Sequence, residues 1–416
     1  MSRWTAVSPW VETVSRHLPT LSPAHARVLA LWSYGVALTQ RAGTTSVAAL
    51  LAAVLGQQEN TVRQRLREWY WEAEHKRGRQ RQAVEVTACF AALLGWVLAW
   101  WPPSERRLAL ALDATTLGQR FTVLRVSVVY RGCAIPVAWA VTRANTPGAW
   151  RPHWLRLLGL VGNTTPTDWT VLVLADRGLY ARWLYDAIQQ AGWHPFLRIN
   201  AGGLYRPLAG GGLRPLASAA PAVGTRWSGA VQAFATPRSR LTCTLLACWE
   251  PGHTDRWLVL TDLAPATASV AWYGMRSWIE QGFKDLKRGG WGWHQTKMTA
   301  PARAERLWLV LAVATLWMVS VGGQAEAALA PSSPSSPSSP SSPSSLDTLT
   351  LTLPARPAPR RLSVFRRGQL VVLAALAAGR RWPLGFFACP SWVGEQPLQP
   401  ATLSARPPSA HAHTYP

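Results

Sequence analysis

The chain has 416 residues, of which 43 are Lys or Arg and 20 are Asp or Glu, so its formal charge is +23. A chain this basic, with only 15% charged residues, predicts a polyanionic partner, with nucleic acid first and an anionic membrane surface second. Its two long apolar stretches, residues 88–101 and 307–321, are shorter than the roughly 20 residues that span a bilayer, which favours buried core helices over membrane spans.

The first residues, MSRWTAVSPWVETVSRH, do not contain the apolar core of a signal peptide. We therefore expect a cytoplasmic protein, associated with the bacterial nucleoid if its partner is DNA.

Residues 1–104 are expected to form a helical DNA-binding domain. The segment TSVAALLAAVLGQQENTVRQRLREWYWEA predicts a helix, a break at Gly56 to Glu59, and a second helix capped by Asn60, which is helix-turn-helix spacing. The second helix has an apolar stripe of Val62, Leu66, Trp69 and Ala73. Arg63 and Arg67 share another face, where they could reach a DNA groove. Ordinary helical bundles show the same pattern, so both interpretations stay open.

From residue 107 the pattern changes to strands. Three strands are expected at 107–113, 121–130 and 133–142, followed by a helix near 150–160, a strand at 169–176, a helix at 180–192 and a strand at 194–199. The unbroken apolar run of 169–176 is typical of a central strand covered on both faces. This order of elements is that of an RNase H-like α/β fold, a mixed sheet with flanking helices.

The expected catalytic core covers residues 105–325. Within it, residues 200–265 are Gly-rich and strand-prone, which predicts a β-rich insertion before the last helix of the core. Residues 326–358 contain the repeat PSSPSSPSSPSSPSS and are expected to be a Pro/Ser-rich linker. Residues 359–416 form a basic C-terminal tail with one short helix, expected either to contact phosphates or to dock, and a passive tail is the alternative.

Two aspartates end expected strands, Asp113 the first and Asp176 the fourth. Ligands gather at this edge of open α/β sheets, although an Asp there can also simply cap the next turn. If the helix that bears Glu280 packs across these neighbouring strands, three carboxylates converge. Their mutual repulsion would be compensated by divalent cations, and oxygen-only ligands favour Mg²⁺ or Mn²⁺. Two such ions about 4 Å apart can activate a water molecule and stabilise the leaving oxygen of a phosphodiester.

The segment YGMRSWIEQGFKDLK, residues 273–287, is expected to be one helix. Offsets of 3, 7 and 14 residues place Tyr273, Arg276, Glu280 and Lys287 within an arc of roughly 60° on one face. The other side gathers the apolar residues Trp272, Met275, Trp278, Ile279, Phe283 and Leu286. An amphipathic helix with a solvated polar face is the plain alternative.

The spacing Tyr-x2-Arg-x3-Glu-x6-Lys resembles the signature of the DDE transposases of insertion-sequence family four. LALDATTLG, at 110–118, resembles the segment around the first aspartate of that family, and LADRGLYARWLYDAIQQAGWHPFLRI, at 174–199, the segment around its second. The likeness covers roughly residues 105–325.

The resemblance implies that Asp113, Asp176 and Glu280 bind Mg²⁺, with Mn²⁺ as a substitute, and form the catalytic triad. It also implies cut-and-paste transposition, in which a homodimer assembled on DNA cleaves the transposon ends and joins them to target DNA. The residues expected to hold the DNA are Tyr273, Arg276 and Lys287, with Arg177 assisting at a phosphate.

The resemblance also singles out Trp257. Some relatives cut the second strand through a DNA hairpin and place a tryptophan just before a similar strand to receive a flipped base. Stacking on an aromatic face returns about 1–3 kcal/mol per base. Packing is the alternative role in a chain with 25 tryptophans, and Trp227 and Trp249 are rivals in the same insertion.

Two other functions stay open. A transposase-derived DNA-binding protein without catalysis would bind DNA but would not nick it. A simple RNase H-like nuclease would cut DNA without joining it, and it would have no obvious use for the insertion or for the signature helix.

Overall fold

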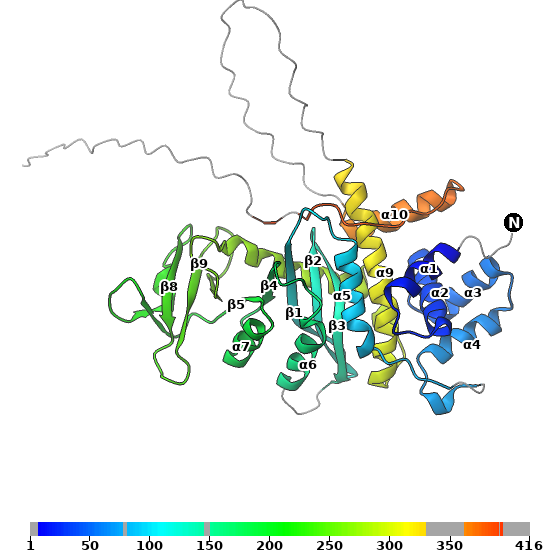
Figure 1. The fold of residues 1–416 in the computed structure, drawn as a ribbon, viewed down its shortest axis with the longest axis horizontal. Helices are drawn as coiled ribbons and strands as arrows, with labels where there is room; N and C mark the ends of the chain where they lie inside the picture. The colour runs from blue at the N-terminus through cyan, green and yellow to red at the C-terminus, as the bar shows by residue number, and fades with distance from the viewer. Residues whose placement is uncertain (1–6, 78–80, 145–149, 330–361, 391, 394–416) are drawn as a thin grey trace, which may run out of the picture.

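The structure is a computed structural model that describes residues 7–77, 81–144, 150–329, 362–390 and 392–393. Figure 1 shows an elongated molecule, with the N-terminal helices at one end, a mixed sheet flanked by helices in the middle, and strands β8 and β9 at the other end. The repeat at 331–345 lies outside the described residues.

The N-terminal part is helical, as expected. Its helices are α1 (Ser8–His17), α2 (Pro23–Thr39), α3 (Thr44–Leu55) and α4 (Glu59–Trp69), followed by a 3₁₀ turn, η1 (Ala73–His75). Trp10 of α1 stacks on Trp317 at a ring-centroid distance of 4.6 Å, and the Trp69 indole donates to the backbone oxygen of Arg306 at 3.0 Å. Both partners lie on one long core helix, so these helices pack directly on the core.

The α3–α4 pair differs from the expectation in two details. Gly56, in the left-handed region, ends α3, but α4 begins at Glu59, so Asn60 lies inside the helix instead of capping it. An acidic residue is favourable at the positive end of a helix, which accounts for the earlier start. Because α4 ends at Trp69, Ala73 is not part of the apolar stripe, whereas Val62, Leu66 and Trp69 are buried as expected.

The central sheet has the RNase H-like order β3-β2-β1-β4-β5. Its strands are β1 (Arg107–Leu117), β2 (Phe121–Tyr130), β3 (Cys133–Arg143), β4 (Thr170–Ala175) and β5 (His194–Arg198), with α6 (Arg151–Gly162) and α7 (Arg182–Gln190) between them. The first three strands are antiparallel, and β4 runs parallel to β1 and β5. The expected fold class is confirmed. However, β1 continues for four residues beyond Asp113, where it pairs with β2 but no longer with β4.

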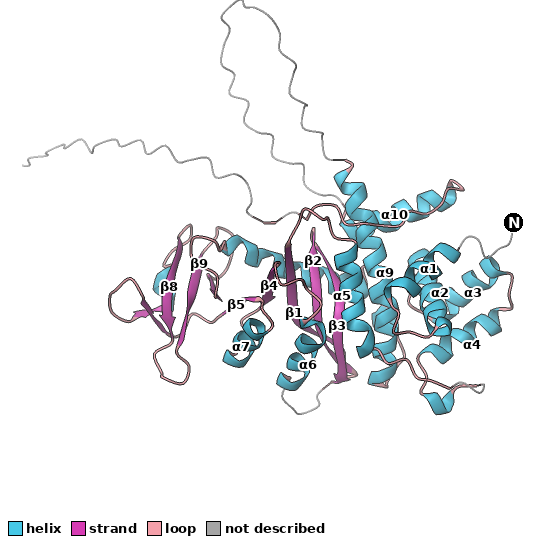
Figure 2. Ribbon diagram, viewed as in Figure 1, coloured by secondary structure: helices cyan, strands magenta, loops and turns pink. Residues whose placement is uncertain are grey.

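The segment after β5 is β-rich, as expected, and it extends the same sheet. It contains β6 (Leu204–Pro207), β7 (Arg214–Pro215), the 3₁₀ turn η3 (Leu216–Ala219), β8 (Arg226–Ala233), β9 (Leu241–Cys248) and β10 (Trp257–Thr261). Because β10 pairs antiparallel with β5, the described residues form one sheet of ten strands, coloured magenta in Figure 2.

Both apolar stretches form buried helices. The first gives a 3₁₀ turn, η2 (Thr87–Cys89), and α5 (Phe90–Ala99), and the second lies within α9 (Pro301–Ala327). In the described residues, α9 is the one helix long and apolar enough to cross a membrane, but 94% of its apolar window is buried inside the protein. It packs against β3 and α2, as a core helix does.

The described part of the tail forms α10 (Val364–Ala377), which crosses α9 at backbone contact. A Cβ on Gly322 would lie 1.9 Å from the backbone oxygen of Val364, and one on Gly368 would lie 1.8 Å from that of Met318. Only glycine allows two helix backbones to approach so closely, so α10 packs on α9 through these two glycines.

The signature segment is not one α-helix. It forms a 3₁₀ helix, η4 (Val270–Ser277), followed by α8 (Trp278–Leu286), and a short 3₁₀ turn, η5 (Trp293–Gln295), follows. Helix α8 packs across β1, β2 and β3, instead of across the first and fourth strands, and η4 contacts β4. A Cβ on Gly282 would lie 2.8 Å from Arg125 Nη2 and 2.9 Å from Ala134 Cβ, so this glycine sets how closely α8 approaches the sheet.

We expect Gly282→Ala to lower the free energy of unfolding by about 1–3 kcal/mol, because the added methyl group overpacks the contact between α8 and the sheet. Thermal unfolding followed by circular dichroism measures the effect. Gly159→Ala is the matched control, because Gly159 is an exposed helical glycine of α6 with no atom within 4 Å of the added Cβ. The control should gain about 0.5–1 kcal/mol. Equal shifts in both variants would contradict a tight approach at Gly282.

Candidate active site

The two aspartates lie side by side at one edge of the sheet. The parallel ladder of β1 and β4 ends with the pair Leu112 and Ala175, so Asp113 and Asp176 are the next residues on the two strands. Asp113 Oδ1 accepts a hydrogen bond from the backbone N–H of Ala114 at 2.8 Å. Asp176 Oδ1 accepts from the N–H of Gly178 at 3.0 Å and from that of Leu179 at 3.2 Å. One oxygen of each carboxylate is thus held by backbone N–H groups one to three residues later in the chain, and the other oxygen faces Arg276.

The available oxygens meet at Arg276, on η4. Its Nη2 donates to Asp113 Oδ2 at 2.9 Å and to Asp176 Oδ2 at 3.1 Å. Its Nη1 donates to Glu280 Oε1, one turn later in the chain, at 2.5 Å. The three carboxylates therefore converge as expected, but on a guanidinium whose side chain is only 13% exposed.

This guanidinium compensates an unfavourable group of charges. Burial raises the pKa of Asp113 above its usual value, and Arg276 acts in the opposite direction by favouring the ionised form. The neighbouring charge of Asp176 raises the pKa of Asp113 as well. The positive charge of Arg276 thus favours the ionised form of Asp113.

The donor atoms fit a hard divalent cation, although their arrangement centres on Arg276. Within the described ranges, no three His, Cys, Asp or Glu side chains are grouped closely enough to hold one ion. Glu280 is separated from the two aspartates, since it is 56% exposed and is bonded to a different nitrogen of the Arg276 guanidinium. All the available atoms are carboxylate oxygens, the ligands that Mg²⁺ and Mn²⁺ prefer.

Tyr273 does not lie on the exposed polar face predicted to meet DNA. It is buried in η4, and burial raises its pKa to about 12. Its ring meets the edge of Trp257, the first residue of β10, at a centroid distance of 5.3 Å. Among the three candidate tryptophans of the insertion, Trp257 is the one that contacts a signature residue, because Trp227 packs on Tyr205 and Trp249 lies against Arg256.

Lys287 also departs from the expected helix face, because α8 ends one residue before it. Its ammonium group donates to Thr115 Oγ1 at 2.7 Å and to the backbone oxygen of Thr116 at 2.9 Å. Burial lowers its pKa, and the charge of Arg125 acts in the same direction. Lys287 is therefore fixed to β1, two to three residues after Asp113.

The other candidate residues lie outside this cluster of contacts. Arg177 follows Asp176 directly, but its guanidinium forms an ion pair with Asp255 at 2.8 Å, and Asp255 also binds Arg198 at 2.6 Å. On α4, Arg63 donates to Asn60, and Arg67 lies over the ring of Trp71 at 5.4 Å.

One residue of the site was not anticipated. Arg125 on β2 is fully buried and is the register partner of Asp113. Its Nη2 donates to the backbone oxygen of Ile279 at 2.9 Å, and its guanidinium lies 4.0 Å over the ring of Phe283. Burial lowers its pKa to about 9, and the charges of Asp113 and Asp285 act against this. The sequence signal for Arg125 was that it is the single charged residue of the strand FTVLRVSVVY.

Comparison with known proteins finds a matching family and similar solved structures. Residues 107–317 match the family model described as "Transposase DDE domain". A piggyBac transposase, solved by cryo-EM as a synaptic complex with hairpin DNA, is 11% identical, with 75% of this chain and 72% of that chain covered at a TM-score of 0.36. No curated protein matches the chain. The matched residues take in β1 to β10, η4 and α8 with all three carboxylates, and the chain belongs to the family of proteins with a transposase DDE domain.

Proposed function

We propose that this protein is a transposase of insertion-sequence family four that binds the ends of its own element. It catalyses metal-dependent cleavage of DNA strands and their transfer to target DNA. The observation that carries the proposal is the convergence of Asp113, Asp176 and Glu280 on one guanidinium at the edge of an RNase H-like sheet. The family and the charge of +23 support DNA as the substrate.

In this proposal the three carboxylates hold Mg²⁺, with Mn²⁺ as a substitute. The bound ions supply an activated water or hydroxyl and stabilise the leaving oxygen of a phosphodiester. Arg276 shields the carboxylates from one another until cations do so, and its guanidinium then becomes available to a DNA phosphate. Lys287, fixed to β1 beside Asp113, adds a second phosphate contact. We further propose that two copies assemble on DNA, one at each end of the element.

Asp113→Asn, Asp176→Asn and Glu280→Gln should each abolish nicking of a duplex that contains the element's end. Binding to that duplex should stay near the wild-type level, because carboxylates that hold a cation act on the transition state and contribute little to the DNA contact area. A gel assay with labelled DNA and Mg²⁺ measures nicking, and a mobility shift measures binding.

Asp186→Asn is the matched control, since Asp186 is a half-exposed aspartate of α7 paired with Arg182, and it should keep full nicking activity. Near-normal nicking by any of the three site variants would refute the assignment. A wild-type protein that binds the duplex but never nicks it would favour the DNA-binding protein without catalysis.

Arg276→Gln should make the stability of the protein depend on divalent cations. In EDTA we expect the variant to lose about 1.5–3 kcal/mol of unfolding free energy, because three carboxylates lose charge-assisted hydrogen bonds. Added Mg²⁺ should raise the melting temperature of the variant more than that of the wild type. Arg177→Gln, which removes a largely exposed ion pair with Asp255, should show no such difference. An equal response to Mg²⁺ in all three proteins would rule out this role of Arg276.

Trp257→Ala should separate the first cut from the second. If Trp257 receives a base flipped from the stack, the variant nicks the first strand but accumulates the nicked intermediate, because stacking worth about 1–3 kcal/mol is lost. An abasic site at the flipped position should partly restore the second cut. Trp227→Ala, in the same insertion but packed on Tyr205, should cut both strands. Normal second-strand cutting by a folded Trp257→Ala protein would remove this residue from the mechanism.

A further inference from the structure

Three cavities that share lining residues lie beside the candidate active site. The first, of about 700 Å³, lies at the end of α8 and is lined by Lys287. The second, of about 570 Å³, shares Arg288 and His294 with the first. The third, of about 680 Å³, shares Arg41 and Gln295 with the second. We call this run of three cavities the basic groove.

The lining of the basic groove is positively charged throughout. Besides Lys287, its Lys and Arg residues are Arg41, Lys284, Arg288, Lys297, Arg303 and Arg366. No Asp or Glu lines any of the three cavities in the described part of the chain. Elsewhere arginines near the site are matched by carboxylates, as Arg177 and Arg198 are by Asp255 and Arg306 is by Glu72.

The charge excess of the chain alone does not explain this arrangement. With 43 basic and 20 acidic residues, many cations must lack a carboxylate partner somewhere. What distinguishes the basic groove is that seven of them share one hollow that begins at Lys287, next to Asp113. Like charges gathered without counter-charge repel one another, and a polyanion laid along the hollow removes that repulsion.

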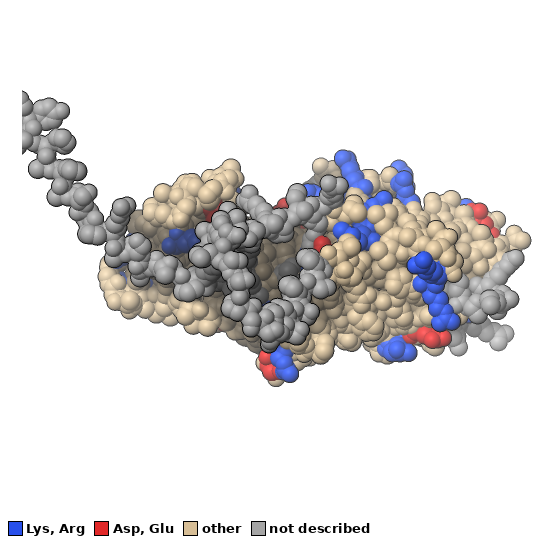
Figure 3. All heavy atoms as spheres, turned by 90° about the horizontal axis from the view of Figure 1, so that it is seen from above, with Lys and Arg blue, Asp and Glu red and all other residues tan. Residues whose placement is uncertain are grey.

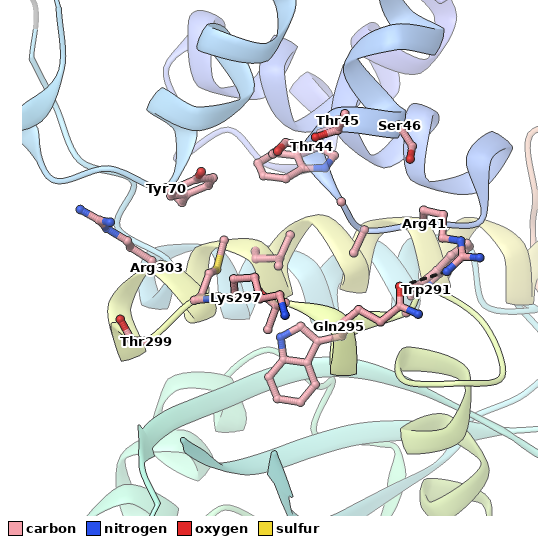
Figure 4. A pocket seen from close by; sticks show the side chains of 18 residues that line it. Arg41, Thr44, Thr45, Ser46, Tyr70, Trp291, Gln295, Lys297, Thr299 and Arg303 are labelled. Atoms are coloured by element: carbon pink, nitrogen blue, oxygen red, sulfur yellow. Dashed lines mark hydrogen bonds between the residues drawn. The ribbon is translucent and has the colours of Figure 1, made fainter. Parts of the chain in front are cut away.

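The third cavity brings the groove to the N-terminal helices. Figure 4 shows Thr44, Thr45 and Ser46 on one side of it, and Gln295 and Lys297, from the segment after α8, on the other. Thr44 to Ser46 form the first turn of α3, where backbone N–H groups add partial positive charge. The face of the molecule in Figure 3 likewise shows more Lys and Arg than Asp and Glu among its described atoms.

We infer that the basic groove binds the sugar–phosphate backbone of duplex DNA that flanks the cleavage site and leads it from Lys287 to the first turn of α3. The inference rests on the proposed function, since it places the substrate of the same site. Duplex DNA is favoured over a small anion because the cations come from three separate chain segments: residue 41, residues 284–303 and residue 366. A single phosphate would use only one of these segments.

Arg288→Ala combined with Lys297→Ala tests the inference. Both side chains are exposed, at different cavities of the groove, and the structure shows no hydrogen bond or ion pair from either side chain among the described residues. The probe is a labelled duplex of about 30 base pairs that contains the element's end, with binding followed by fluorescence anisotropy over a range of salt concentrations. Each lost phosphate contact lowers the slope of log K against log salt by about 0.9, so the double variant should lose about two units.

The matched control is Arg206→Ala combined with Arg214→Ala, which removes two exposed charges from β6 and β7, at the far end of the sheet. The control should keep the wild-type slope. Hydroxyl-radical footprinting should show protection shortened on one side of the cleavage site for the groove variant only. Should the alanine variant unfold at a lower temperature, Arg288→Gln with Lys297→Gln keeps the side-chain bulk and tests the same charges.

The outcomes separate this inference from the proposed function. A groove variant that matches the wild type in slope and footprint overturns the inference while leaving the proposed function intact. Equal losses in the groove and control variants also overturn it, because they reflect net charge alone. A third outcome is that the wild type never nicks DNA, while the groove variant alone loses salt slope and footprint. That outcome supports the groove and refutes the proposed catalysis.

Discussion

The hydrogen bonds of Arg276 to three carboxylates are the interaction on which the site depends. The register of β1 and β4 places Asp113 and Asp176 at neighbouring positions, where two ionised carboxylates would repel each other. A positive group must therefore stand between them. Arg276 can do so because it lies four residues before Glu280, so the same chain segment brings the third carboxylate and the counter-charge together.

A second arginine, on the strand beside Asp113, stabilises the site. Arg125 is fully buried, and its Nε and Nη1 have no hydrogen-bond partner among the described residues, an arrangement that costs more than an apolar side chain would. Its contacts explain what it provides, since it binds the Ile279 carbonyl just before Glu280 and acts on Asp113 across the β1–β2 ladder. Asp113 is thus influenced by two arginines, one on the strand beside it and one on the segment that covers the sheet.

The sequence predicted the strand order, the buried helices and the meeting of the three carboxylates, because apolar runs and strand-end aspartates are local signals. It did not predict that the signature segment changes from 3₁₀ to α-helix at Ser277, or that Tyr273 is buried. The burial of Tyr273 depends on a tertiary contact, because Trp257 of β10 lies against its ring. Arg125 escaped notice because a lone arginine in a strand becomes meaningful only once the hairpin register pairs it with Asp113.

Helix α9 connects these parts into one frame. The Thr315 hydroxyl on α9 accepts from the indole of Trp291, in the segment after α8, and the carbonyl of Trp291 accepts from the N–H of Ala42, just before α3. Trp69 at the end of α4 is bonded to the start of the same helix. Both walls of the basic groove are therefore fixed to one buried helix. If the basic groove binds DNA as proposed, this shared attachment to α9 would fix which phosphodiester lies beside Asp113.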